Sequence, residues 1–271
     1  MNEPFIIMSA PNGARRQKSD HPALPITPDD MALCAELILS QGASILHLHV
    51  RDEFGGHSLD VDRYRASITA IRDAVGDELI IQATTESVGI YNRHQQMEMV
   101  KSLKPEATSL ALRELCPTED DVLEFSEFTK WINQEHIFPQ YILYNQYDYD
   151  RFEIYRKQGI FHDDNPFVLF VLGSYTATDE AATEKLKQTT LQAKFPWAVC
   201  GFDTNEKNSV IHAAKNNGHI RVGFENNLWR TENELLQDSG EMIRYSAKIA
   251  ALEKRSVATA TMIRNIFNLR D

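Results

Sequence analysis

Short apolar runs alternate along the chain with longer stretches in which apolar residues recur every three or four positions. The short runs have the length and composition of buried strands, and the longer stretches have the period of amphipathic helices. This alternation predicts βαβ units with parallel strands. Eight strands are predicted, at Phe5–Ala10, Ser44–Val50, Leu79–Thr85, Ala107–Leu112, Gln140–Tyr144, Phe167–Leu172, Trp197–Phe202 and Ile220–Phe224.

Helical stretches lie between these strands and carry recognisable end signals. Thr27, followed by Pro28, is a predicted N-cap, and Thr118 with Asp121 has the spacing of a capping box. Glycines are expected to end four helices, at Gly42, Gly76, Gly159 and Gly218. The predicted helices are Pro28–Ser40, Asp62–Val75, Arg93–Ser102, Glu119–Glu135, Asp148–Gln158, Asp179–Ala193, Glu206–Asn216 and Glu241–Lys254.

Eight regular units in 271 residues favour a (β/α)8 TIM barrel that occupies residues 1–271 as a single domain. An open doubly wound sheet is the alternative, but its Gly-rich phosphate-binding turn does not follow the first predicted strand. The stretch Thr259–Asn268 predicts an extra C-terminal helix, which we expect to cover the barrel or to form a subunit contact.

Composition narrows the class of protein further. Hydrophobic residues make up 42% of the chain and charged residues 25%, as in ordinary globular proteins. The net charge of −11 argues against a nucleic-acid partner, and no apolar stretch is long enough to cross a membrane. The three cysteines form no CxxC pair, so we expect them to be buried free thiols in a cytoplasmic protein. The expected partner is a small molecule, because binding even an anionic one needs only a few local donor groups, which the net charge does not exclude.

Two histidines at the end of the second predicted strand are candidates for metal binding. Side chains alternate along a strand, so His47 and His49 share one face while the leucines between and before them share the other. If the leucines pack on the helices, both imidazoles point into the barrel mouth. Such a pair suits Zn²⁺, or less specifically Mn²⁺, Fe²⁺ or Co²⁺, although two hydrogen-bonded histidines would show the same pattern.

Glu225 ends the eighth predicted strand and strengthens the metal prediction. Barrel closure places strand eight beside strand one, and strand one beside strand two. Glu225 can therefore reach His47 and His49 and complete a set of two histidines and one glutamate. Without the two histidines, Glu225 would be better explained as a helix N-cap or as the partner of Arg221 in a salt bridge.

The loop after the first predicted strand is basic in an acidic protein. Residues 11–18 read PNGARRQK and belong to the predicted barrel mouth. Asn12 and Arg15 are the residues that we expect to bind substrate, as part of an anion site. An ordinary solvated loop is the alternative.

Four sequence motifs resemble the β-keto acid cleavage enzymes. They are HLHVRD within Leu46–Asp52, RVGFENN at Arg221–Asn227, the run Leu24–Pro28 and FVLG at Phe170–Gly173. The resemblance follows the whole chain in order. It implies a zinc-dependent (β/α)8 barrel, usually a homotetramer, that condenses a β-keto acid with acetyl-CoA to give acetoacetate and a new CoA thioester.

The same resemblance implies roles for individual residues. His47, His49 and Glu225 would be the metal ligands, and Arg221 would match the arginine that tunes a neighbouring catalytic acid. Thr84 and Ser109, on the third and fourth predicted strands, would hold substrate oxygens. A metal bound there would polarise the ketone of the substrate.

The sequence also departs from the family pattern at acidic positions. Asn226 stands where the family has an aspartate that is a candidate base, and an amide cannot accept that proton. Ile142 aligns with an inward glutamate of the fifth strand. Glu86, at the end of the third predicted strand, is the candidate replacement base. Arg113 and Glu114 follow the fourth predicted strand in a loop, where a surface ion pair is the alternative for them and for Glu86.

Two further functions remain open from the sequence. One is a metal-dependent aldolase-like lyase or hydrolase that uses no CoA. The other is a binding protein without catalysis. A two-metal hydrolase is disfavoured because the remaining histidines considered are predicted in loops or helices away from strand ends; these are His57, His94, His136, His162 and His212. Stacking of a substrate on Tyr144, Tyr175 or Trp229 is a further possibility.

Overall fold

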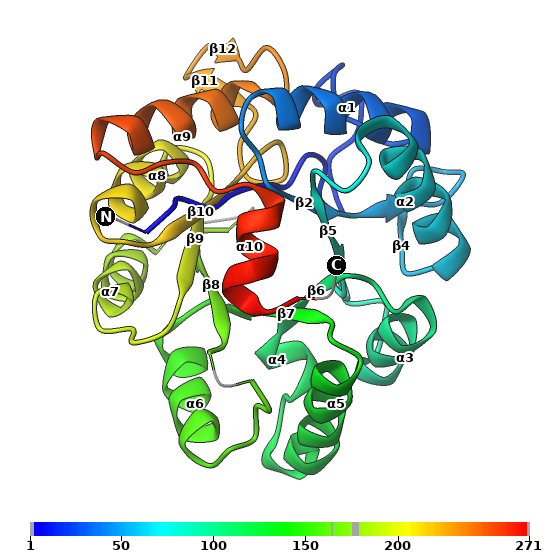
Figure 1. Ribbon diagram of the computed structural model, residues 1–271, viewed down its shortest axis with the longest axis vertical. Coiled ribbons are helices and arrows are strands. Elements are labelled where there is room, and N and C mark those ends of the chain that lie inside the picture. Colours follow the sequence, from blue (N-terminus) through cyan, green and yellow to red (C-terminus); the bar gives the residue numbers. More distant parts are fainter. Residues whose placement is uncertain (1–2, 164, 175–178, 270–271) are drawn as a thin grey trace.

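Eight parallel strands close into a barrel in the computed structural model, which describes residues 3–163, 165–174 and 179–269. Around the barrel the order is β1, β10, β9, β8, β7, β6, β5 and β2, so β1 lies between β10 and β2 (Figure 1). The predicted TIM barrel is confirmed. The barrel strands are β1 (Ile7–Ser9), β2 (Ile45–Leu48), β5 (Ile80–Thr84), β6 (Ala107–Ala111), β7 (Phe138–Leu143), β8 (Phe167–Leu172), β9 (Trp197–Gly201) and β10 (His219–Val222).

Helices form a ring outside the barrel (Figure 1). The Thr27 cap is confirmed, because its side chain accepts a hydrogen bond from the Asp30 amide and Asp30 completes a capping box. No described helix is long and apolar enough to span a membrane. The helices of the ring are α1 (Pro28–Ser40), α2 (Val61–Val75), α3 (Arg93–Leu103), α5 (Val122–Gln134), α6 (Gln146–Lys157), α7 (Glu180–Thr190), α8 (Asn205–Lys215) and α9 (Glu241–Leu252).

Several short elements were not predicted. The helix α4 (Leu112–Leu115) follows β6 directly, and the predicted helix Glu119–Glu135 begins as a 3-10 turn, η1 (Glu119–Asp121). Two small hairpins, β3–β4 and β11–β12, leave the barrel, with strands too short to show a periodic pattern. Their bounds are Val50–Arg51, His57–Ser58, Trp229–Thr231 and Glu234–Leu235.

The prediction that Gly218 ends a helix was wrong. Asn217 adopts the left-handed conformation there, with φ of 57°, and Gly218 does not. The reason for glycine at this position is space, because a Cβ atom would lie 2.2 Å from the Trp197 ring. Asparagine is one of the few residues that tolerates the left-handed region, so it replaces glycine at the turn.

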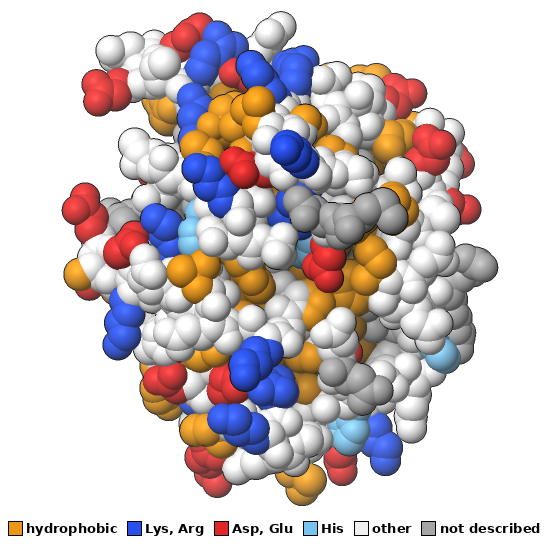
Figure 2. Space-filling model, turned by 60° about the vertical axis from the view of Figure 1, so that its left-hand side comes forward, with side chains coloured by type: hydrophobic (Ala, Val, Ile, Leu, Met, Phe, Trp, Pro, Cys, Tyr) orange, Lys and Arg blue, Asp and Glu red, His pale blue; other side chains and the backbone are white. Residues whose placement is uncertain are grey.

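Two apolar layers hold the barrel together. Residues that point outward from the strands pack against the helices, and residues that point inward fill the barrel, as strand alternation requires. The inward set includes Met8, Ile45 and Leu169. All three cysteines are buried and free, as predicted. On the face in Figure 2, acidic and basic side chains are interspersed.

The C-terminal helix α10 (Ala260–Phe267) crosses the end of the barrel where the strands begin (Figure 1). Its Phe267 ring lies 4.4 Å from the ring of Phe138, which in turn stacks on Phe167 at 5.7 Å. Ile263, on the same helix, is fully buried against the barrel interior residues. The expectation that this helix covers the barrel is therefore confirmed, and the opposite end, where strands finish, is left for the functional site.

His219 makes stability sensitive to acid. Burial lowers its pKa from 6.5 to about 3, and its Nδ1 accepts a hydrogen bond from the Ile6 amide. Between these two pKa values the His219 imidazole is protonated in the unfolded chain and neutral in the folded protein. The free energy of unfolding therefore falls by about 1.4 kcal/mol for each pH unit below 6.5. A His219→Asn variant, which keeps an acceptor but cannot titrate, should lose less stability between pH 7 and pH 4 in urea unfolding. Equal losses in both proteins would contradict this assignment.

Candidate metal centre and cavity

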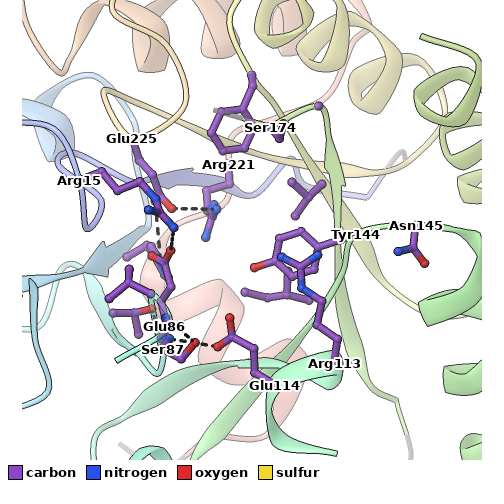
Figure 3. A pocket seen from close by; sticks show the side chains of 18 residues that line it. Arg15, Glu86, Ser87, Arg113, Glu114, Tyr144, Asn145, Ser174, Arg221 and Glu225 are labelled. Atoms are coloured by element: carbon purple, nitrogen blue, oxygen red, sulfur yellow. Dashed lines mark hydrogen bonds and ion pairs between the residues drawn. The ribbon is translucent and has the colours of Figure 1, made fainter. Parts of the chain in front are cut away.

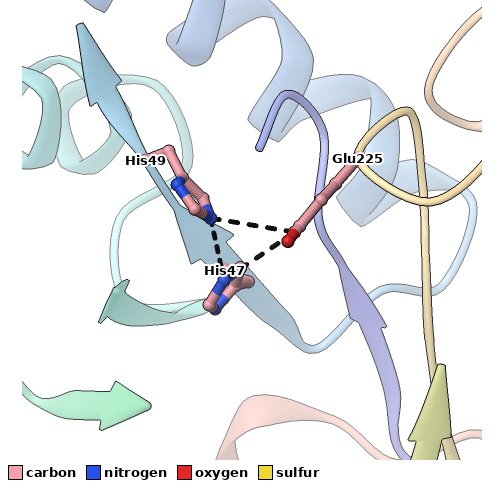
Figure 4. A group of neighbouring side chains, drawn as sticks. All are labelled: His47, His49 and Glu225. Atoms are coloured by element: carbon pink, nitrogen blue, oxygen red, sulfur yellow. Dashed lines mark hydrogen bonds and ion pairs between the residues drawn. The ribbon is translucent and has the colours of Figure 1, made fainter. Parts of the chain in front are cut away.

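His47 and His49 point into the barrel from adjacent inward positions at the end of β2 (Figure 4). Leu46 and Leu48 belong to the outer core, as alternation predicted. The two Nε2 atoms lie 3.1 Å apart. Burial is the main factor that holds the pKa of both imidazoles well below 6.5, so both are neutral and carry a lone pair for a metal ion.

Glu225 reaches these histidines because the backbone after β10 is held against the end of β1. The Glu225 amide donates to the Ala10 carbonyl at 3.1 Å. Gly223 permits this approach: its φ is 141°, and a Cβ atom would lie 2.4 Å from the Ala10 oxygen. Glu225 Oε2 lies 3.8 Å from Nε2 of His47 and 3.8 Å from Nε2 of His49.

These three residues fit a divalent transition metal. Ligand atoms around a tetrahedral zinc ion stand roughly 3.4 Å apart, close to the three separations in this cluster. Glu225 Oε2 is buried without a hydrogen-bond partner, as expected of an atom placed for a cation. Two imidazoles and a carboxylate are also a donor set that zinc prefers and that leaves coordination positions for substrate.

The far side of each imidazole faces a hydrogen-bond acceptor. His47 Nδ1 lies 2.7 Å from Gln82 Oε1, and because an amide oxygen only accepts, the proton sits on Nδ1 and Nε2 is free to bind. His49 Nδ1 has no hydrogen-bond partner and lies 3.8 Å from Glu86 Oε2. Arg221 holds the other oxygen of Glu225 at 3.4 Å. Neighbouring polar groups therefore orient His47 and Glu225.

A cavity of about 510 Å³ opens from the cluster to the barrel mouth. Its volume lies in the range of small-molecule sites. Figure 3 shows Glu225, Arg221 and Arg15 on one side, with Arg113 and Tyr144 across from them. Six of the residues predicted for the site line it, namely Arg15, His47, Thr84, Glu86, Arg221 and Glu225.

Glu86 is the predicted base and lies on the cavity wall. Its carboxylate is 3.9 Å from Arg15 Nη2, besides its contact with His49. Burial, followed by the negative charges of Glu225 and Glu114, raises the pKa of Glu86 to about 7. Its backbone is fixed as well, because the Glu86 amide donates to Thr84 Oγ1 at 3.1 Å.

The first loop is tied to the hairpin β3–β4 by Arg51, the arginine of the HVRD motif. The guanidinium donates to the carbonyls of Gly13 at 2.5 Å, Arg16 at 2.9 Å and Gly55 at 2.8 Å. This clamp leaves Arg15 at the cavity wall. The other two cations of the loop face elsewhere: Arg16 lies 3.9 Å from Asp203, and Lys18 pairs with Asp30 at the N-terminus of α1.

Four predicted site residues do not line the cavity: His49, which lies behind His47 in the cluster, and Asn12, Ser109 and Asn226. Asn12 is buried and donates to the His49 carbonyl at 3.1 Å, so it holds the backbone at a ligand position. Ser109 points into the barrel with a buried hydroxyl that has no hydrogen-bond partner. Asn226 is fully buried and its side-chain amide also has no partner, while its carbonyl accepts from the Asp203 amide at 3.1 Å.

The prediction that placed His57 away from the site was wrong. It lies on β4, its ring is 5.4 Å from that of His49, and its Nε2 donates to the Glu86 carbonyl at 2.8 Å. A hairpin of two-residue strands gave no sequence signal for this return toward the barrel. Arg113 and Glu114 lie in α4 rather than in a loop, and both line the cavity, so the alternative of a surface ion pair does not describe them.

One position that departs from the family pattern and one candidate aromatic residue lie on the cavity wall. Ile142 does lie on the cavity wall, where an acidic residue was expected from the family pattern. Tyr144 lines the same cavity, whereas Trp229 lies on the hairpin β11–β12 outside it. Tyr175 lies outside the described residues.

Comparison with known proteins identifies the family. The sequence profile of the beta-keto acid cleavage enzyme family matches residues 4–269. The chain belongs to this family. It is 29% identical over its full length to the full-length 3-keto-5-aminohexanoate cleavage enzyme of Fusobacterium nucleatum. It is 23% identical to the 3-oxoadipate:acetyl-CoA acetyltransferase of Cupriavidus necator, with 99% of this chain and 96% of the relative covered.

The fold agrees with a solved structure. Apo ObcA superposes with a TM-score of 0.70 at 15% sequence identity, covering 92% of this chain and 66% of that protein. The chain therefore spans about two thirds of the length of ObcA. At this identity the likeness concerns the barrel alone, while the family match makes the protein an enzyme of the β-keto acid cleavage type.

The candidate metal centre predicts stoichiometric binding. Purified protein dialysed with Zn²⁺ should retain about one ion per chain, and His47→Ala should bind it at least about 100-fold more weakly because a ligand is lost. Metal analysis after dialysis and competition with a chelator measure this. His94→Ala, at an exposed histidine of α3, is the control and should keep its metal. Full retention by His47→Ala would exclude the cluster as the binding site.

The Arg51 clamp predicts a stability cost. Arg51→Met leaves buried carbonyls without donors and should lower the free energy of unfolding by about 2 to 4 kcal/mol. Arg65→Met is the control, because Arg65 lies on the surface of α2 and pairs with Asp62 there. Urea unfolding measures both. If the two variants are equally stable, the clamp is not a structural tie.

Proposed function

We propose that this enzyme uses a divalent metal, with zinc as the best fit, to condense a β-keto acid with acetyl-CoA, giving acetoacetate and a new CoA thioester. The observation that carries the proposal is the cluster of His47, His49 and Glu225 at the base of a cavity in a barrel of this family. The printed name of the relative from Cupriavidus necator, an acetyl-CoA acetyltransferase, supports the choice of co-substrate.

The chemistry needs a polarised ketone and a base beside it. When bound at the cluster, a divalent metal supplies Lewis acidity to the oxygens of the keto acid. Thr84 lines the cavity and accepts from the Glu86 amide, which leaves its hydroxyl hydrogen available to a substrate oxygen. Arg221 positions the Glu225 carboxylate. The side-chain amide of Asn226 cannot take a proton, so we look for the base among the residues of the cavity wall.

Glu86 is the residue that we assign as this base. It is on the wall beside His49, and its carboxylate can remove a proton from the carbon between the ketone and the carboxylate of the substrate. That carbon forms a bond to the acetyl carbonyl, and the CoA thiol leaves with the proton. The CoA thiol then attacks the ketone carbon of the keto acid. The bond between this carbon and the carbon that had been deprotonated breaks, which gives the new thioester, and the proton of the thiol passes to the departing acetoacetate.

The function is tested by supplying metal-loaded protein with acetyl-CoA and a panel of β-keto acids that differ in side chain. We expect acetoacetate and a matching acyl-CoA in equal amounts from at least one member. Mass spectrometry of the thioester distinguishes this reaction from a lyase or hydrolase, which would consume the keto acid without acetyl-CoA. Absence of acetoacetate across the panel would refute the proposal.

The base assignment predicts the effect of Glu86→Gln. The amide keeps the shape of the side chain but cannot accept the proton, so kcat should fall by about 10²- to 10⁴-fold while bound metal is unchanged. Glu114→Gln is the matched control: Glu114 lines the same cavity, but its carboxylate accepts from the Ser87 amide at 3.0 Å. A larger loss in Glu114→Gln than in Glu86→Gln would transfer the role to Glu114.

A further inference from the structure

Arg113 places a positive charge on the cavity wall across from the candidate metal centre (Figure 3). Its guanidinium lies over the ring of Tyr144, with Cζ 3.5 Å from the ring centre. Tyr144 is itself held where β7 ends, because its amide donates to Asp148 Oδ2 at 2.9 Å. Stacking on an anchored aromatic ring limits the rotamers of arginine and leaves the edge of the guanidinium to donate hydrogen bonds.

Arg113 lies near the carboxylates of Glu114 and Asp148 but is at ion-pair distance from neither. Within the described residues no carboxylate lies at ion-pair distance from Arg113, although the cavity also contains Glu86 and Glu114. The Glu114 carboxylate accepts a hydrogen bond from the Ser87 amide at 3.0 Å, which orients it toward that backbone. The other two arginines of the cavity differ in this respect, because Arg15 and Arg221 each lie within 4 Å of a glutamate carboxylate.

The part of the cavity wall at the ends of β7, β8 and β9 is apolar. Ile142, Val171 and Phe202 line it, and Ile142 stands where a carboxylate was expected from the family pattern. A substrate whose keto-acid end lies at the metal centre would run its methylene carbons along this wall. Its far end would then meet Arg113.

We propose that Arg113 binds an anionic group at the far end of the substrate, so that the enzyme prefers β-keto acids with a second, terminal carboxylate. This inference rests on the proposed function and names the substrate class for it. A guanidinium binds a carboxylate through two parallel hydrogen bonds, which a terminal methyl cannot make and a terminal ammonium would oppose. The phosphates of CoA offer the same anionic chemistry, and the experiment separates the two.

The experiment compares three β-keto acids of equal chain length that end in a carboxylate, a methyl group or an ammonium group. With acetyl-CoA and metal-loaded protein, kcat/KM should be about 10- to 100-fold higher for the terminal carboxylate. Arg113→Met should abolish this preference and leave the KM for acetyl-CoA unchanged. Tyr144→Phe, which retains the ring, should keep the preference, and Tyr144→Leu should weaken it.

A binding measurement gives a second readout that does not depend on turnover. Calorimetry with an unreactive straight-chain dicarboxylate and the monocarboxylate of equal length should show tighter binding of the dicarboxylate. Arg113→Met should lose the difference, with its melting temperature confirming that it is folded. If no acetoacetate forms but this difference persists, the proposed reaction fails and the anion subsite stands.

Two results would overturn the subsite. One is equal use of the three keto acids by the wild-type enzyme together with equal binding of the two unreactive acids. The other is an Arg113→Met variant that raises the KM for acetyl-CoA and keeps the carboxylate preference, because Arg113 would then serve the phosphates of CoA.

Discussion

Closure of the sheet is the constraint on which the rest of this protein depends. Because β1 pairs with β10 on one side and with β2 on the other, the ends of strands from opposite ends of the chain become neighbours. Glu225 follows His49 by 176 positions in the printed sequence, yet its carboxylate lies 3.8 Å from the imidazole. Gly223 allows the backbone after β10 to approach Ala10, and this approach brings Glu225 to the histidines. A sheet that stayed open at β1 and β10 would separate the ligands.

Burial then decides the chemical state of the residues that closure brings together. His47 and His49 are neutral because the barrel interior penalises a charge and the positive charge of Arg221 opposes protonation further. Glu225 is buried beside Arg221, and one of its oxygens has no hydrogen-bond partner. A buried carboxylate oxygen of this kind is costly in an empty protein and favourable beside a cation. The same physics that folds the barrel therefore prepares the cluster for a metal.

The residues in and around the cavity partly match the family motifs and partly depart from them. The histidines and Glu225 match the family motifs, while Asn226 and Ile142 remove acids that the pattern contains. The structure places Glu86 beside His49 and Arg113 across the cavity from the candidate metal centre. The centre of the site is thus kept and its walls are changed, which is the arrangement expected when relatives share a reaction and differ in substrate.

The sequence by itself determined the barrel, the inward direction of His47 and His49 and the most plausible third ligand. These follow from strand alternation and from the rule that parallel strand ends meet at one mouth, both of which are local or topological. The tertiary structure alone decided that His57 returns to the site, that Arg51 clamps the first loop and that Arg113 stacks on Tyr144. These contacts arise from loops and two-residue strands, which have no period, so their geometry depends on packing that only the folded chain defines.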